Sequence, residues 1–359
     1  MTTAPSALAR DSGRRHRPAM ALVLLALLAL LGLAVVLSAA VGAAGIPPAR
    51  LLALTGLTPA DPATFARDHL VLWSIRLPRI ALAATVGALL AASGAMMQGL
   101  FRNPLADPAM VGVSSGAAFA AALTIIAVDR FATAGGLLSL GLLPVVALIG
   151  ALITTAALYR LATRHGRTSI AVFLLGGLAI AALTNAGIGF LVFMADDRQL
   201  RDITFWMLGS LGGATWQKVA IVAPFLIATV AGIPLIARGL DLLALGETEA
   251  FHMGIAVERL KRLAILLVAV AVGAAVAFCG VVGFVGIVVP HLLRLVIGPG
   301  HRLLLPATML LGAAMLLAAD TAARTLVAPA ELPIGIVTAI VGAPFFLGLL
   351  LRQRNLVGL

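Results

Sequence analysis

The chain has 359 residues, of which 62% are hydrophobic and only 11% are charged, and its formal net charge is +11. Soluble domains carry about 25% charged residues, so this composition excludes a soluble globular protein. The positive charge does not indicate nucleic-acid binding, because the basic residues lie at the ends of apolar stretches, where membrane topology requires them.

Long stretches without Asp, Glu, Lys or Arg run along the chain, and a membrane-spanning helix needs about 20 apolar residues. They are 18–49, 80–101, 108–128, 131–159, 168–195, 219–237, 263–293, 303–319 and 332–351. Because the connections between them are short, we expect an all-α polytopic membrane protein without a sizeable soluble domain. The first stretch is too long for a cleaved secretory signal, so it predicts a retained first helix.

The stretch 263–293 is long for one helix and short for two. It contains Gly280, Gly283 and Gly286 followed by Pro290, a combination that breaks helices. We therefore divide it into a helix near 263–280 and a short helix near 284–297.

This division gives about ten helices and places both termini on the same side. Most of the 25 Lys and Arg residues then fall on the cytoplasmic side, whereas the bias disappears without the division. The sequence predicts a cytoplasmic tail over 1–17, one transmembrane domain over 18–352 and a second cytoplasmic tail over 353–359. We expect outer connections at 44–76 and 326–332, a surface helix within 199–213, and a long inner loop at about 238–262.

Residues 86–104 and 272–290 resemble each other weakly, with identities at small residues and at Pro104 and Pro290. The two segments fall on the second and seventh predicted helices, which point in opposite directions. This is the arrangement of an inverted-topology repeat, which is common in transporters.

Several motifs follow one another in order along the chain. They are Arg-Leu-Pro-Arg at 76–79, Gly-Ala-Met-Met-Gln-Gly at 94–99, Phe-Arg-Asn-Pro-Leu-Ala-Asp-Pro at 101–108, Gly-Val-Ser-Ser-Gly at 112–116, Gly-Phe-Val-Gly-Ile-Val-Val-Pro-His at 283–291, Leu-Ala-Ala-Asp at 317–320 and Glu-Leu-Pro-Ile-Gly at 331–335. From about residue 70 to 352 the chain strongly resembles the FecCD-type permeases, which import ferric siderophores, haem and cobalamin.

The resemblance implies an inverted-repeat importer permease fold in a homodimer, with a transport pathway at the two-fold axis. It also implies two cytoplasmic ATPase subunits, a periplasmic substrate-binding protein, and a multi-pass location in the bacterial inner membrane. The chain has no phosphate-binding Gly-Lys-Ser/Thr loop. We therefore expect no enzyme activity and no bound cofactor in this subunit, with ATP and Mg bound by the partner ATPase.

The inner loop 238–262 is the predicted contact with the ATPase. A short amphipathic helix between two spans is a plausible docking element, and the alternative is a solvated connection. By resemblance, this loop carries the coupling helix. The coupling residues are then Leu245, Gly246, Glu247, Glu249, Ala250 and Gly254.

Arg76, Arg79 and Arg324 place positive charge on the predicted outer side, against the general bias. The resemblance implies that they dock acidic residues of the binding protein, and the alternative is interfacial snorkelling. Asp320 lies within a span, four residues before Arg324, so both share one helix face. We interpret these two residues as an intramembrane ion pair, rather than as the proton relay of an ion-coupled carrier.

Asn103, Leu105, Thr168 and Ser169 lie at predicted inner helix ends. By resemblance they occupy the cytoplasmic gate of the family. Helix N-capping is the simpler role for Thr168 and Ser169, and both roles are compatible.

The segment 204–213 resembles the haem permeases more than the cobalamin branch. The spans contain no pair of histidines, so we predict no metal site and a haem cargo that passes without axial ligation. Import of ferric siderophores or cobalamin is the alternative. An ion-coupled carrier would need more intramembrane ionisable groups, and an intramembrane enzyme would need a metal cluster or a nucleophile with its base.

Overall fold

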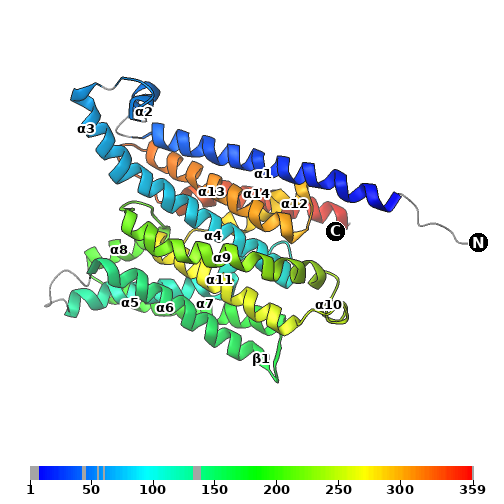
Figure 1. Ribbon diagram of the computed structural model, residues 1–359. Helices are drawn as coiled ribbons and strands as arrows, with labels where there is room; N and C mark the ends of the chain where they lie inside the picture. The colour runs from blue at the N-terminus through cyan, green and yellow to red at the C-terminus, as the bar shows by residue number, and fades with distance from the viewer. Residues whose placement is uncertain (1–7, 43–45, 55, 60, 132–138, 358–359) are drawn as a thin grey trace, which may run out of the picture.

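The computed structural model describes residues 8–42, 46–54, 56–59, 61–131 and 139–357. These residues form a bundle of helices, most of which lie side by side along one direction (Figure 1). The helices are α1 (Leu8–Ala40), α2 (Pro48–Leu54), α3 (Pro62–Leu70), the π-helical turn η1 (Val71–Arg76), α4 (Leu77–Phe101), the 3₁₀ turn η2 (Pro108–Val111), α5 (Val113–Phe131), α6 (Ser139–Ala162), α7 (Ile170–Met194), α8 (Asp197–Leu208), α9 (Trp216–Leu243), α10 (Glu247–His252), α11 (Val257–Cys279), α12 (Val285–Ile297), α13 (His301–Thr325) and α14 (Ile334–Val357). Two short strands, β1 (Thr163–Arg164) and β2 (Arg167–Thr168), form an antiparallel hairpin.

Within the described residues, seven helices are long and apolar enough to cross a membrane, and three apolar helices are shorter. The shorter ones lie at Val113–Ala127, Val285–Ile297 and Ile334–Leu349. This set confirms the predicted all-α polytopic architecture.

The predicted division of 263–293 is confirmed. α11 ends at Cys279, where Gly280 has a φ of 72°, and α12 begins after Phe284, which has a φ of 68°. Two residues with positive φ so close together cannot continue a right-handed helix, so the chain must change direction here.

The predicted outer connection 44–76 differs most from the structure, because much of it is helical. Asp61 accepts a hydrogen bond from Ala63 N at the start of α3, and Pro62 occupies the first turn, which fixes a strong helix start. From there α3, η1 and α4 run on as one apolar helical segment. The π-helical turn lies directly before Pro78, which has no N–H to donate.

Other predicted boundaries shift by several residues. The inner loop 238–262 shortens, because α9 extends to Leu243 and α11 starts at Val257. The helix predicted within 199–213 starts earlier, at Asp197, where Asp196 and Gln199 form a capping box. Helices also extend into the predicted tails, since α1 begins at Leu8 and α14 ends at Val357.

The bundle has two distinct ends (Figure 1). We call the end with α10 and the β hairpin the α10 end, and the opposite end, with α2, α3 and α8, the α8 end. α1 begins and α14 ends at the α10 end, as an even number of crossings requires (Figure 1).

α4 is the central helix of the bundle. In the most apolar part of the helical segment that contains α4, 83% of the residues are buried, whereas the share in α1 is 0%. Glycines allow its neighbours to approach closely: a Cβ on Gly94 would lie 1.8 Å from the carbonyl oxygen of Gly286 in α12. A Cβ on Gly87 would lie 2.3 Å from that of Gly312 in α13. Such backbone contacts are the usual means by which helices pack in a membrane, where apolar burial alone gives little attraction.

We predict that Gly94→Ala destabilises the protein, because the new methyl group has no space and α12 must move. Overpacking of this kind costs about 1–3 kcal/mol. Gly32→Ala in α1 is the matched control, since nothing lies within 4 Å of its new Cβ. Thermal unfolding in detergent should show a lower midpoint for Gly94→Ala alone, and equal midpoints for the two variants would contradict the packing described here.

Candidate functional site

The predicted coupling residues form a compact segment at the α10 end. Gly246 and Gly254 flank α10 with φ angles of 131° and 84°, a region that favours glycine. Ala250 is fully buried, whereas Leu245 and Phe251 are 63% and 67% exposed. α10 therefore packs one face on the bundle and presents apolar side chains on the other.

The predicted gate residues Asn103 and Leu105 lie in the loop after α4. Arg102 ends the helix in the left-handed conformation, and the Asn103 side chain then accepts a hydrogen bond from Leu105 N at 2.9 Å. Further along this loop, burial raises the pKa of the Asp107 carboxyl above its ordinary value, although the N–H of Ala109 that it accepts opposes the shift.

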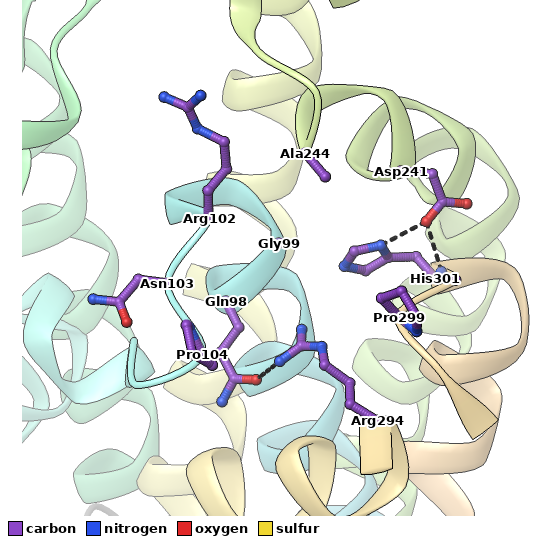
Figure 2. A pocket seen from close by; sticks show the side chains of 11 residues that line it. Gln98, Gly99, Arg102, Asn103, Pro104, Asp241, Ala244, Arg294, Pro299 and His301 are labelled. Atoms are coloured by element: carbon purple, nitrogen blue, oxygen red, sulfur yellow. Dashed lines mark hydrogen bonds and ion pairs between the residues drawn. The ribbon is translucent and has the colours of Figure 1, made fainter. Parts of the chain in front are cut away.

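A pocket of about 360 Å³ adjoins this loop (Figure 2). Asn103 contributes to its lining, and two side-chain pairs border it, one joining α4 to α12 and the other joining α9 to α13. Arg294 donates a hydrogen bond to Gln98, and His301 contacts Asp241 at 2.7 Å through Nδ1 (Figure 2). The sequence alone did not reveal these pairs, because their partners are far apart in the chain.

Thr168 and Ser169 lie at the end of the β hairpin, whose turn is formed by His165 and Gly166, both with positive φ. Ser169 is the N-cap of α7 and accepts a hydrogen bond from Val172 N, so its predicted capping role is confirmed. The capping role of Thr168 is wrong. Thr168 belongs to β2 instead, and its backbone N–H donates to Glu258 at 3.0 Å.

At the α8 end, charged side chains join α4, α13 and the loop before α14. Arg79 Nη2 lies 2.9 Å from Asp320, and Arg79 Nη1 lies 2.9 Å from Glu331. Arg324 Nε lies 3.2 Å from Asp320, which gives the ion pair expected from the sequence, and Arg324 also donates to Ser38. Asp320 is only 1% exposed and binds two guanidinium groups.

Arg76 and Arg324 are only 4% and 8% exposed. Arg76 donates to the backbone carbonyls of Ala39 and Ala40 at the end of α1. Arg76, Arg79 and Arg324 are therefore engaged within the chain in this structure, and their docking role stays a prediction. A guanidinium removed from water needs acceptors, and each of these three finds them within the chain.

Two charged residues emerge as more important than the sequence suggested. Lys261 is 2% exposed and contacts Glu247 at 2.8 Å, and Glu331 binds Arg79. Lys261 follows Glu258 by three residues, a spacing that could have indicated a helix-face pair. Within the described ranges, no group of three or more His, Cys, Asp or Glu side chains is placed to hold a metal ion.

Residues 28–352 match the model of the FecCD transport family. The chain belongs to this family. It is therefore a permease subunit of ABC importers, a multi-spanning inner-membrane protein in a family whose ATP hydrolysis is carried out by a separate subunit, and it is not itself an enzyme.

Curated relatives cover most of this FecCD permease. The hemin transport system permease protein HmuU of Yersinia pestis is 48% identical over 79% of the chain and 83% of the relative. The cobalamin import system permease protein BtuC of Halobacterium salinarum is 45% identical over 80% of the chain and 74% of the relative. The vitamin B12 import permease BtuC of Klebsiella pneumoniae is 41% identical over 81% of the chain and 85% of the relative.

Solved structures support the same fold. A metal-chelate type ABC transporter in an inward-facing conformation matches with a TM-score of 0.79 and 35% identity, over 92% of the FecCD chain and 99% of the other. PsaBC from Streptococcus pneumoniae, solved with a Fab, matches with a TM-score of 0.52 at 17% identity over 78% of this chain and 92% of the other, so this likeness concerns the fold alone.

We predict that Asp320→Asn strongly destabilises the protein, because it leaves Arg79 and Arg324 buried beside a neutral partner. Breaking a buried pair in this way costs about 3–5 kcal/mol. Asp202→Asn is the control: its partner Arg198 lies 4.0 Å away and both side chains are more than half exposed, so a loss of less than about 1 kcal/mol is expected. Denaturation in detergent measures both, and a loss for Asp320→Asn no greater than for the control would show that the network contributes little.

Proposed function

We propose that two copies of this permease assemble with two ATPase subunits and a periplasmic binding protein, and import haem at the expense of ATP. The observation that carries the proposal is 48% identity to a hemin permease over about four fifths of the chain. The exposed apolar face beside α10, and the absence of a nucleotide-binding loop from the sequence, support a separate energy-supplying partner.

The homodimer is supported by α7. Only 17% of the residues in its most apolar part are buried within one chain. It exposes large apolar side chains, such as Leu178 and Phe193, together with Asn185 near the middle of the helix. An amide facing lipid is costly, and polar residues in spans usually face protein or a water-filled cavity. This face therefore suits a second copy and the pathway between the two.

We predict that Gly254→Val uncouples or detaches the ATPase while the membrane fold stays intact. Valine at a φ of 84° is strained and distorts the end of α10. Gly298→Val is a close control, because Gly298 has a φ of 83° and neither glycine has an atom within 4 Å of an added Cβ. Co-purification and ATP-dependent uptake report the result; if Gly254→Val transports normally, α10 is only a linker.

Docking of the binding protein by Arg79 is also part of the proposal, but Glu331 competes for its guanidinium. Glu331 is the more exposed partner, with 46% of its side chain accessible. An acidic residue of the binding protein could replace it. We predict that Glu331→Gln strengthens docking by up to about 1 kcal/mol, the range of an exposed pair.

Binding of the binding protein to the purified complex at low salt measures this effect. Asp202→Asn serves again as the control for removing an acidic charge at the α8 end. Weaker or unchanged docking in Glu331→Gln would contradict a role for Arg79 in recognition, and would restrict this arginine to the internal network.

Uptake by the reconstituted complex tests the cargo. Haem, cobalamin and a ferric siderophore are each offered to proteoliposomes under three conditions: with ATP, with a non-hydrolysable ATP analogue, and with ATP plus an ionophore. We expect haem uptake that needs ATP hydrolysis and survives the ionophore. Uptake of cobalamin or the siderophore without haem would overturn the cargo, and uptake driven by an ion gradient would overturn the class.

We also predict that His291→Ala retains haem uptake, because a tight iron ligand in the pathway would slow release. His291 is 9% exposed and its ring lies edge-on to Phe345 at 5.9 Å, so it fills space between α12 and α14. Loss of haem uptake with normal assembly and ATPase activity would instead indicate axial ligation.

A further inference from the structure

Lys261 lies where three separate parts of the α10 end meet. It belongs to the first turns of α11, yet its side chain is only 2% exposed. A lysine ammonium has three N–H donors and seeks an acceptor for each when it leaves water. The positions of the three acceptors therefore show what this buried charge holds together.

Each acceptor comes from a different place. Glu247, the first residue of α10, lies 2.8 Å from Lys261 Nζ, and Glu258, in the first turn of α11, lies 3.0 Å away. The third acceptor is the backbone carbonyl of Thr168, at 3.1 Å. One ammonium thus joins the predicted coupling helix to the predicted gate.

Both backbone polar groups of Thr168 are held by hydrogen bonds. Its carbonyl accepts from Lys261, and its N–H donates to the second oxygen of Glu258 at 3.0 Å. The next residue, Ser169, is the N-cap of α7. A displacement of Thr168 therefore displaces the start of α7.

α10 has open space on the side that faces Lys261. A cavity of about 630 Å³ lies there, and Glu247, Lys261 and Thr168 all contribute to its lining. A push on the exposed face of α10 can shift Glu247 without an immediate clash, and the shift reaches Thr168 through the ammonium group.

We infer that Lys261 is a positioning residue that transmits movement of α10 to the gate end of α7. The inference rests on the proposed function, in which an ATPase moves α10. The route bypasses the covalent path, since Lys261 and Thr168 are 93 residues apart in sequence. A purely structural role would instead be limited to holding α10 in place for docking.

The test uses the full complex of permease, ATPase and binding protein in proteoliposomes. Lys261→Met removes the charge and keeps much of the side-chain length, Lys261→Arg keeps the charge, and Glu247→Gln weakens the α10 contact from the more exposed side. Arg259→Met is the matched control, because Arg259 is an exposed basic residue in the same turn of α11.

Gate movement is read from a cysteine at Ala171, an exposed position in the first turn of α7, in a Cys279→Ser background. Labelling by a membrane-impermeant maleimide is compared with and without ATP and vanadate. This readout does not depend on the identity of the cargo.

We expect Lys261→Met to retain the ATPase subunit and its hydrolysis, to lose the ATP-dependent change in labelling, and to reduce uptake per ATP by about tenfold, within the usual range of coupling energies. Glu247→Gln should act in the same direction, Lys261→Arg should restore part of the coupling, and Arg259→Met should resemble the wild type.

Two results would overturn the inference that Lys261 transmits movement. In the first, uptake per ATP and the ATP-dependent labelling stay normal in Lys261→Met. In the second, that complex loses the ATPase, which would show that Lys261 only supports docking. Where the Lys261→Met permease itself fails to fold in the membrane, Glu247→Gln decides between the same outcomes. If labelling of the wild-type complex does not change with ATP, both the proposed function and the transmission through Lys261 are refuted. If labelling changes with ATP in both the wild type and Lys261→Met, only the transmission through Lys261 is refuted.

Discussion

The bilayer offers no hydrogen-bond partner to a polar group, and the arrangement of this permease follows from that constraint. Backbone groups are satisfied within helices. Charged side chains near or within the spans find partners in the chain, as Asp320 does between Arg79 and Arg324. Because these partners come from α4 and α13, the need to neutralise charge also fixes how the central helices sit against each other.

The same constraint decided which features the sequence could predict. Spans and their number follow from local composition, and the break between α11 and α12 follows from a local cluster of glycines. Ser169 could be assigned as a cap because a cap acts within one turn of its own helix. Properties that depend on a short window were therefore predicted well, with errors of several residues at the helix ends.

Partners distant in the sequence were not predictable in this way. Arg79 and Glu331 are separated by 252 positions, and Lys261 and Thr168 by 93. An arginine near a span end looks the same in the sequence whether it faces water or an internal carboxylate. The docking arginines were therefore assigned from outward charge and from the family resemblance, and only the fold shows that Arg76 and Arg324 are buried. The helices at 48–54 and 62–76 were missed because Arg50, Asp61, Arg67, Asp68 and Arg76 interrupt a search for uncharged stretches.

The distribution of packing also separates a fixed part of the bundle from a part suited to move. α4 is held by close contacts of its backbone with Gly312 and Gly286, at Gly87 and Gly94, where little sliding is possible. α7 has few buried residues in the same chain.

In the proposed transport cycle, α7 and α14 are each attached at one end by a charged contact. The start of α7 is joined through Thr168 to Lys261 and α10, on the side where an ATPase is expected. The start of α14 follows Glu331, which Arg79 binds at the α8 end, where a binding protein is expected. Each of these two helices therefore has its anchor beside the partner expected at that end, while the closely packed α4 lies in the core. A partner that alters one anchor can then move its helix without repacking the core.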